Sequence, residues 1–199
     1  MGYTSSVLVL EFCNTDCEVI MTTDKKSSMW WAELLLDEAR QLDWLVKQYH
    51  GEVMAGERIR TIFGKFNLSD RDAKVVEGVA REEDLHAKWI GELLQSRGVE
   101  PSRLSEHKER YWAAQPVDNL RSPEEAAAVG HLAEVMRLSR IKAIVNNPDS
   151  PFDIAKVMKK ILRQELGHAA KFKRLSNSRA IDDARGGHDA GLNALGLAS

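Results

Sequence analysis

Two short motifs in the sequence pair a glutamate with a histidine three residues later. Glu83 precedes His86, and 82 residues further along Glu165 precedes His168. Because residues three apart on an α-helix point the same way, each pair offers a carboxylate and an imidazole to one point in space. Oxygen and imidazole ligands suit iron or manganese better than metals that prefer thiolates. Of the six histidines, only these two have a glutamate at this spacing.

The same 82-residue shift relates the segments upstream of the two motifs. Glu52-Val53-Met54 is repeated as Glu134-Val135-Met136, and each copy begins 31 residues before its Glu-x-x-His motif. A lone Glu-x-x-His is weak evidence, because a solvated helix face explains it more often than a site does. Two copies in register indicate a duplicated helical hairpin that builds one two-metal site. The predicted metal ligands are Glu52, Glu83, His86, Glu134, Glu165 and His168.

Charge balance gives a physical reason for this set of ligands. Four carboxylates brought together repel one another, and two divalent cations neutralise their charge. If the six side chains converge, Glu83 and Glu165 are placed to bridge two metal ions ~3.5–4 Å apart. Glu52 and Glu134 then bind from the outer sides, and each histidine binds one ion. The alternative is a hydrogen-bonded network without metal, which would bury six ionisable groups at a high desolvation cost.

Four helical segments have to position these residues. Apolar residues recur at helical spacing in each segment, with the predicted ligands on the apolar face. Ser69 and Ser122 are predicted N-caps, and Gly98 is a predicted helix-ending glycine. The predicted segments run from Ser28 to about Phe66, from Ser69 to Gly98, from Ser122 to Asn146 and from Ser150 to about Leu175. The first is long for one helix, so Trp30–Glu38 is a candidate for a separate turn or a shorter helix.

The connection between the second and third segments is longer than a normal bundle loop. Residues 98–121 are enough to pass back along a whole helix, and we expect Tyr111 and Trp112 to attach them to the bundle. The layout therefore predicts an all-α protein: a four-helix bundle of two helical hairpins joined by a long crossover, which is the ferritin-like arrangement.

The two ends of the chain carry weaker patterns. Residues 1–27 are predicted to form an N-terminal extension, with short strands at Val7–Phe12 and Glu18–Met21. Residues 28–175 form the predicted bundle. Residues 176–199 form a C-terminal tail, which Gly186 and Gly187 are expected to break and which has room for one short helix.

Composition excludes several classes of protein. The chain has 199 residues, of which 43% are hydrophobic and 29% are charged, and its formal net charge is −2. These values indicate a globular protein without a strong field for nucleic acid or an anionic membrane. The sequence has no apolar run of about 18 residues and no signal-peptide pattern. Two cysteines do not make a disulfide framework, so we expect a cytoplasmic protein.

The segments around the predicted ligands resemble the ferritin-like superfamily, and most of all its rubrerythrin-type members. Gly51–Arg58 resembles their first-helix motif and Glu82–Trp89 their second. The resemblance covers roughly residues 40–97 and 122–174. The sequence departs from rubrerythrins proper in two ways: Arg137 stands where they carry an extra carboxylate, and the two Cys-x-x-Cys pairs of their rubredoxin-like centre are absent.

This resemblance implies a di-iron oxidoreductase that reduces O2 or H2O2, with manganese or a mixed iron–manganese pair as alternatives for the metal. The catalytic residues it implies are Glu52, Glu83, Glu134 and Glu165. The implied partners are the small oxidant, an unidentified electron donor and a second copy in a homodimer; no membrane or nucleic-acid partner is expected. Three other functions stay open: ferroxidase chemistry tied to iron storage, hydroxylation of an organic or nucleic-acid-borne group, and a metal-free helical interaction module.

Three residues near the predicted site have two interpretations each. Tyr49 lies one turn before Glu52 and is either a proton or electron shuttle or, as we favour, a core aromatic. His131 is either a seventh metal ligand or a hydrogen-bond donor to one of the ligands. The other interpretation is a histidine of the core or of an interface. Arg137 is expected to pair with a carboxylate in a structural role.

The remaining candidates have structural interpretations. Cys13 and Cys17 are four residues apart and could form a redox pair, although two unrelated thiols are favoured. His107 and His188 are expected to face solvent. Trp44 and Trp89 are expected to pack in the core.

Overall fold

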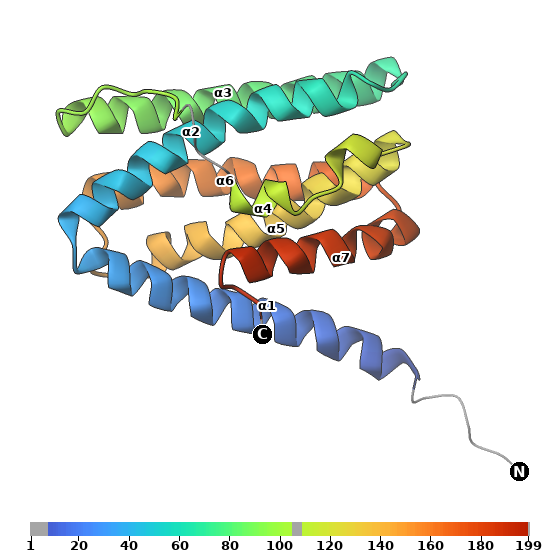
Figure 1. Ribbon diagram of the computed structural model, residues 1–199, viewed down its shortest axis with the longest axis horizontal. Coiled ribbons are helices and arrows are strands. Elements are labelled where there is room, and N and C mark those ends of the chain that lie inside the picture. The colour runs from blue at the N-terminus through green and yellow to red at the C-terminus, as the bar shows by residue number, and fades with distance from the viewer. Residues whose placement is uncertain (1–7, 105–108, 199) are drawn as a thin grey trace, which may run out of the picture.

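The computed structural model describes the backbone of residues 8–104 and 109–198 and, within these ranges, the side chains from residue 22 onward. Its centre is a bundle of four helices: α2 (Glu38–Phe63), α3 (Asp70–Ser96), α5 (Pro123–Asn146) and α6 (Phe152–Leu175). Helix α2 packs against α3, α5 packs against α6, and the contact of α3 with α6 joins the two hairpins (Figure 1). The predicted ferritin-like bundle with a long crossover is confirmed.

Local sequence signals set the ends of these helices. The Ser69 hydroxyl accepts a hydrogen bond from the Asp72 backbone N–H at 3.2 Å, and the Ser122 hydroxyl accepts one from the Glu125 N–H at 3.2 Å. Such caps satisfy N–H groups that have no partner within the helix. Gly98 follows α3 with a φ of 75°, a left-handed conformation that glycine adopts without steric cost. The predicted caps are confirmed.

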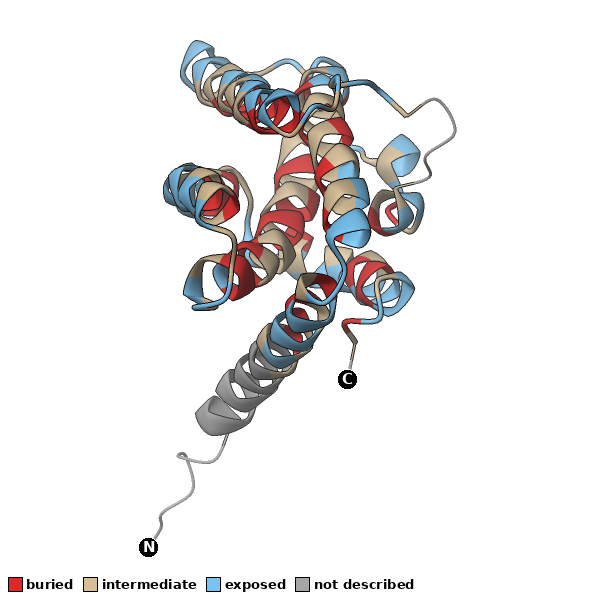
Figure 2. Ribbon diagram, turned by 90° about the vertical axis from the view of Figure 1, so that its left-hand side faces the viewer, coloured by how far each residue is buried: buried red, intermediate tan, exposed pale blue. Residues whose placement is uncertain are grey.

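Two apolar clusters fill the bundle, one toward each end. The first contains Leu45 and Ile90, and the second contains Phe63 and Val79. On α2, Glu52 lies between Leu45 of the first cluster and Phe63 of the second. On each of the other three bundle helices, the predicted ligands likewise lie between a residue of the first cluster and a residue of the second. Buried residues line the inward faces of the helices (Figure 2). The predicted ligands therefore lie in a polar layer between two apolar ones.

The crossover contains two short helical turns, α4 (Arg110–Ala113) and the 3₁₀ turn η1 (Val117–Asn119). Tyr111 is buried, and the guanidinium of Arg58 on α2 lies 4.1 Å from the ring centroid of Trp112. Arg58 also forms an ion pair with Glu109. Trp112 thus attaches the crossover to the bundle, as predicted, whereas the contacts of Tyr111 are with His188 and Gly191 of helix α7 (Ser178–Ala194).

The N-terminal part of the chain differs from the prediction. The strands predicted at Val7–Phe12 and Glu18–Met21 are wrong, because the backbone from residue 8 belongs to one long helix, α1 (Leu8–Leu35). Helix α1 continues across residues 27 and 28 and packs against α5 (Figure 1). The indole N–H of Trp31 donates a 2.7 Å hydrogen bond to Ser150, which attaches α1 to the turn before α6.

Tertiary packing explains why α1 is a helix despite its composition. Thr23, Ser27, Trp31 and Leu34 are buried at spacings of three and four residues, which is the pattern of one helix face against a partner. Short apolar runs rich in threonine and serine do not distinguish a strand from a packed helix. Contact with α5 decides the conformation.

The C-terminal segment also differs from the prediction. Helix α7 (Ser178–Ala194) continues through Gly186 and Gly187 and packs against α5 and α4. The predicted exposure of His188 is wrong, because its ring is buried and its Nδ1 lies 2.8 Å from the hydroxyl of Tyr111. Helix α5 thus contacts α1 and α7 in addition to α6 and α2 (Figure 1).

Some predictions fall on side chains that the structure does not describe. Cys13 and Cys17 belong to the backbone of α1, but their side chains lie outside the described part, as does His107. Among the described helices, none is long and apolar enough to cross a membrane.

Candidate metal centre

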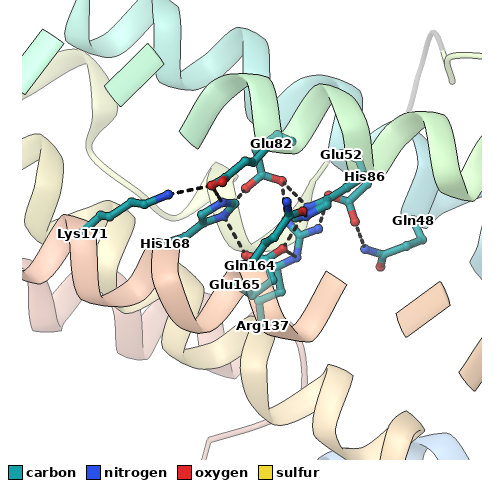
Figure 3. A network of polar contacts seen from close by, with 10 residues as sticks. Gln48, Glu52, Glu82, His86, Arg137, Gln164, Glu165, His168 and Lys171 are labelled. Atoms are coloured by element: carbon teal, nitrogen blue, oxygen red, sulfur yellow. Dashed lines mark hydrogen bonds and ion pairs between the residues drawn. The ribbon is translucent and has the colours of Figure 1, made fainter. Parts of the chain in front are cut away.

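The structure brings all six predicted ligands into the polar layer of the bundle. Helix α2 contributes one glutamate, α5 contributes another, and α3 and α6 each contribute a glutamate and a histidine. Figure 3 labels four of the six, Glu52, His86, Glu165 and His168. Every one of the six side chains is buried. Since burying this many ionisable groups is costly unless they are paired, their convergence indicates a site rather than a solvated helix face.

The six residues form two overlapping groups that could each hold a metal ion. One group consists of Glu52, Glu83, His86 and Glu165, and the other consists of Glu83, Glu134, Glu165 and His168. In each group the potential ligand atoms lie within 4.8 Å of one another. Glu83 and Glu165 belong to both groups. These buried carboxylates and imidazoles are therefore able to hold metal.

The two histidines face the shared carboxylates with the same ring nitrogen. Nδ1 of His86 lies 3.3 Å from Glu83 Oε2 and 3.4 Å from Glu165 Oε1. Nδ1 of His168 lies 3.0 Å from Glu83 Oε1 and 3.1 Å from Glu165 Oε2. The site thus has an approximate internal symmetry, as the duplication of the sequence predicts.

The other ring nitrogen of each histidine has an acceptor of its own. His86 Nε2 lies 2.7 Å from Gln164 Oε1, and His168 Nε2 lies 2.7 Å from Glu82 Oε2 (Figure 3). Lys171 Nζ donates to the same oxygen of Glu82 at 2.6 Å. Because Nε2 donates outward, Nδ1 is the nitrogen that faces the carboxylates, and the orientation of each ring is set.

Glu82 and Gln164 were not among the predicted site residues. A signal for them does exist in the sequence, since each directly precedes a predicted ligand and they are themselves 82 residues apart. The duplication therefore extends beyond the ligands to the residues that orient them. Gln48, which donates a 2.7 Å hydrogen bond to Glu52 Oε1, has glycine at the equivalent position, so no such signal points to it.

Arg137 enters the same layer from α5. Its guanidinium forms an ion pair with Glu52, and it lies 3.4 Å from Glu83 and 3.0 Å from Glu165. Burial would lower the pKa of Arg137, but the surrounding carboxylates raise it well above its ordinary value. The predicted pairing with a carboxylate is confirmed, with three partners instead of one.

The carboxylates differ in their pKa values. Burial and the charge of Glu165 act to raise the pKa of Glu83, but Arg137 and hydrogen bonds from both histidines lower it to about 2. Burial, followed by the charges of Glu165 and Glu83, raises the pKa of Glu134 well above its ordinary value. Glu83 is thus favoured in its ionised form, whereas Glu134 binds a proton more readily than an ordinary glutamate, and a cation binding there would compete with that proton.

The histidines are held as imidazolium ions by the same carboxylates. Burial acts to lower the pKa of both rings, but hydrogen bonds to Glu165 and its neighbours raise it to about 12 for His86 and about 9 for His168. A metal ion bound at Nδ1 would take the place of the Nδ1 proton, and Nε2 would keep its hydrogen bond.

The buried oxygens of the site fit a pair of cations. Each of the four glutamates has one buried carboxylate oxygen without a hydrogen-bond partner among the described residues. Glu52 Oε2 and Glu165 Oε1 lie within ion-pair distance of Arg137, and Glu83 Oε1 lies within ion-pair distance of His168, but none of the three has hydrogen-bond geometry. Glu134 Oε2 has no ion pair with a described residue. Unsatisfied buried acceptors are costly, and divalent cations that prefer oxygen and imidazole ligands would satisfy them.

Four other residues that the sequence singles out pack near the site without belonging to it. His131 Nδ1 donates a 2.9 Å hydrogen bond to the Ala169 carbonyl and belongs to neither metal-binding group. Burial lowers its pKa. Tyr49, Trp44 and Trp89 are partly buried and pack against the apolar cluster that contains Leu45, which is the core position favoured for each of them.

A cavity of about 560 Å³ reaches the site from the side of α2 and α5. Its lining includes Glu134, Arg137 and Gln48, together with residues of α1 and of the crossover around α4. The volume lies within the range of pockets that bind small organic molecules. Sequence patterns did not predict this cavity, because it depends on how α1 and α4 are placed against the bundle.

Comparison with known proteins agrees with this architecture. The family model described as Rubrerythrin matches residues 43–176, which include the four bundle helices almost completely. Comparisons with curated proteins and with solved structures give no match.

Proposed function

Since the chain belongs to the rubrerythrin family, we propose that it is a di-iron oxidoreductase that reduces O2 or H2O2 at a carboxylate-bridged dinuclear site. The observation that carries this proposal is the pair of buried ligand groups that share Glu83 and Glu165. Two iron ions held next to each other would supply two electrons to the oxidant. Manganese or a mixed pair is the alternative metal content, since the same ligands suit it.

The grouping of the ligands supports a role for each residue. The shared pair, Glu83 and Glu165, would bridge the two ions. One ion would be held by Glu52 and His86 and the other by Glu134 and His168. These four glutamates are the residues that we propose as catalytic, because they surround the position at which the oxidant would react.

The surrounding residues would orient the ligands and exclude water. Gln164 and Glu82 hold the histidine rings with Nδ1 inward, so the imidazoles would bind metal without reorganisation. The apolar clusters above and below the polar layer keep water from these two sides, and the cavity beside α2 and α5 leaves a third side open to a substrate. Exclusion of water by the clusters strengthens the electrostatic interactions inside the layer.

Metal stoichiometry tests the proposed ligand roles. We expect the wild-type protein, loaded anaerobically with Fe(II), to bind two ions per chain, and Glu83→Ala and Glu165→Ala to lose two-metal binding because each removes a bridge. Glu92→Ala is the matched control, since Glu92 is an exposed glutamate on the same helix as Glu83. Two ions per chain in both bridge variants would refute the assignment.

The reaction is tested separately from metal binding. The iron-loaded protein should consume H2O2 or O2 and develop ferric absorption bands, and Glu83→Ala should do neither. Loading with Mn(II) instead of Fe(II) distinguishes the two metals. The electron donor, the homodimer and the cytoplasmic location stay predictions; light scattering coupled to size-exclusion chromatography measures the assembly, and a large shell would favour iron storage instead.

A second candidate function is oxidation of an organic substrate at the same metal site. The cavity that reaches Glu134 and Arg137 favours it, because a peroxidase that acts on a small oxidant has no need of a space of this size. Product analysis with the iron-loaded protein, O2 and a reductant separates the two functions: hydroxylated products would favour the second, and water formation alone would favour the first.

A further inference from the structure

The cavity is lined by both apolar and charged residues. Its apolar lining includes Ile59, Phe63 and Phe172, which belong with the second apolar cluster, and Trp30 and Trp44, which pack against the first. Apolar and aromatic walls combined with polar groups are typical of sites for small organic ligands. The lining therefore suits a molecule that has both an apolar body and a polar group.

The lining also includes several basic residues. Three of them have acidic partners: Lys47 pairs with Asp43, Arg58 pairs with Glu109, and Arg137 pairs with the glutamates of the site. Arg140 has no carboxylate partner among the residues that the structure describes. Its buried Nε has no hydrogen-bond acceptor in the same part of the chain.

The surroundings of Arg140 strengthen this observation. Its guanidinium lies 4.3 Å from the ring centroid of Trp30, so the aromatic ring orients the guanidinium within the cavity wall. Burial, and after it the charge of Arg110, lowers the pKa of Arg140 to about 10. Arg110 is exposed and also lines the cavity. Arg110 and Arg140 thus both line the cavity, and neither has a carboxylate partner among the described residues.

We propose that this cavity binds an apolar organic molecule with a carboxylate group, and that Arg140 binds the carboxylate. The planar guanidinium of arginine matches a carboxylate through two parallel hydrogen bonds. Arg140 lies six residues after Glu134 on α5, about 9 Å along the helix axis. The apolar body would therefore extend from Arg140 past Glu134 toward Phe63 and Phe172.

Alternative ligands fit the cavity less well. A molecule without a hydrogen-bond acceptor would leave Arg140 Nε unsatisfied, which is costly for a buried donor, and a neutral acceptor would leave the guanidinium charge without a counter-ion. A cationic molecule would be repelled by Arg140 and Arg110. Binding of the carboxylate does not depend on the metal ions, whereas oxidation of the bound molecule would rest on the function proposed above.

Three probes with the same twelve-carbon chain test the proposal: dodecanoate, dodecanol and dodecyltrimethylammonium. Titration is followed by calorimetry and by the tryptophan fluorescence of the full-length protein, both after chelation and after metal loading. We expect wild type to bind dodecanoate at least about tenfold more tightly than dodecanol, because of the charge-assisted hydrogen bonds. The ammonium probe should bind weakest.

Variants at one position assign the preference to Arg140. Arg140→Gln should lose the preference for dodecanoate over dodecanol, and Arg140→Lys, which keeps the charge, should retain part of it. Arg163→Gln is the control, since Arg163 is exposed on α6 and does not line the cavity. Circular dichroism checks that each variant is folded.

Several outcomes would overturn the inference. They are equal binding of dodecanoate and dodecanol to wild type, no binding of either probe, or an undiminished preference for dodecanoate in Arg140→Gln. None of these outcomes affects the iron stoichiometry of the wild-type protein, so failure here is distinguishable from failure of the proposed di-iron function.

Discussion

Arg137 supplies a positive charge to a layer that contains four carboxylates. Its guanidinium contacts three of them, and a metal ion would be attracted to the same oxygens. Arg137 and the metal ions therefore compete for the negative charge of the site. This competition follows from the arginine at position 137, where the resemblance to rubrerythrins proper implies a carboxylate.

Arg137→Gln should bind Mn(II) more tightly than wild type, because the carboxylates lose a competing cation. The same variant should be less stable after chelation, by about 3–5 kcal/mol, the usual cost of removing one partner from a buried ion pair. Calorimetric titration and urea denaturation measure the two effects. Arg60→Gln is the control, since Arg60 pairs with Glu77 and Asp84 at the surface. Weaker binding in Arg137→Gln would show that Arg137 supports the metal site.

Gln164→Leu tests the role of residues that orient the histidines. Leucine has a similar volume but no acceptor, so His86 Nε2 loses its 2.7 Å contact. We expect metal affinity to fall by about 10- to 100-fold at one of the two ions, as is typical when the partner of a ligating histidine is removed. Titration with Mn(II) measures the affinity, and the exposed neighbour in Arg163→Leu serves as the control. Unchanged affinity in Gln164→Leu would mean that bundle packing alone orients the ring.

At the scale of elements, α7 depends on close contact with the crossover. A Cβ atom on Gly191 would lie 2.5 Å from a ring carbon of Tyr111, whereas a Cβ atom on Gly186 would meet nothing within 4 Å. The glycine at 191 is therefore required by packing against α4. Gly186 weakens the helix, and no packing contact requires glycine there.

Two glycine-to-alanine variants of α7 separate helix propensity from packing. Gly186→Ala should raise the free energy of unfolding by up to about 1 kcal/mol, the usual advantage of alanine over glycine inside a helix. Gly191→Ala gains the same propensity but forces Tyr111 to move, so we expect a net loss of about 1–2 kcal/mol. Urea denaturation followed by circular dichroism measures both. Equal stabilisation by the two substitutions would mean that α4 moves away from α7 without cost.

At the scale of the whole molecule, the site lies where all four bundle helices meet. Metal ions bound there would link both hairpins, so metal binding and global stability are coupled. Without metal, the charges of the layer are balanced by Arg137 and the imidazolium groups. The coupling predicts that the stability of the complete fold depends on the concentration of metal.

Removal of metal by a chelator should lower the melting temperature by about 5–10 °C. Free metal at a hundredfold excess over its dissociation constant contributes ~2.7 kcal/mol, and about 2–4 °C corresponds to each kcal/mol in a protein of this size. Thermal unfolding of wild type with and without Mn(II) measures the shift. Glu83→Ala should show little shift, and an equal shift in that variant would indicate metal binding elsewhere.

The chain's sequence alone was enough to predict the bundle and the convergence of its ligands. The 82-residue duplication carries this information, because it repeats a pattern that depends only on helical spacing. Ser69 and Ser122 likewise begin helices through contacts within four residues. Features that depend on local geometry, or on two copies of one local pattern, can be read without knowledge of the tertiary structure.

Contacts between distant segments decided the rest. Helix α1 takes its conformation from α5, and His188 is buried where Tyr111 of the crossover reaches it. The cavity beside Arg140 is formed jointly by α1, the crossover around α4 and the bundle. The three carboxylate partners of Arg137 come from three other helices. Each of these features joins residues far apart in the chain, so no periodicity or motif encodes it, and only the packing of complete helices determines it.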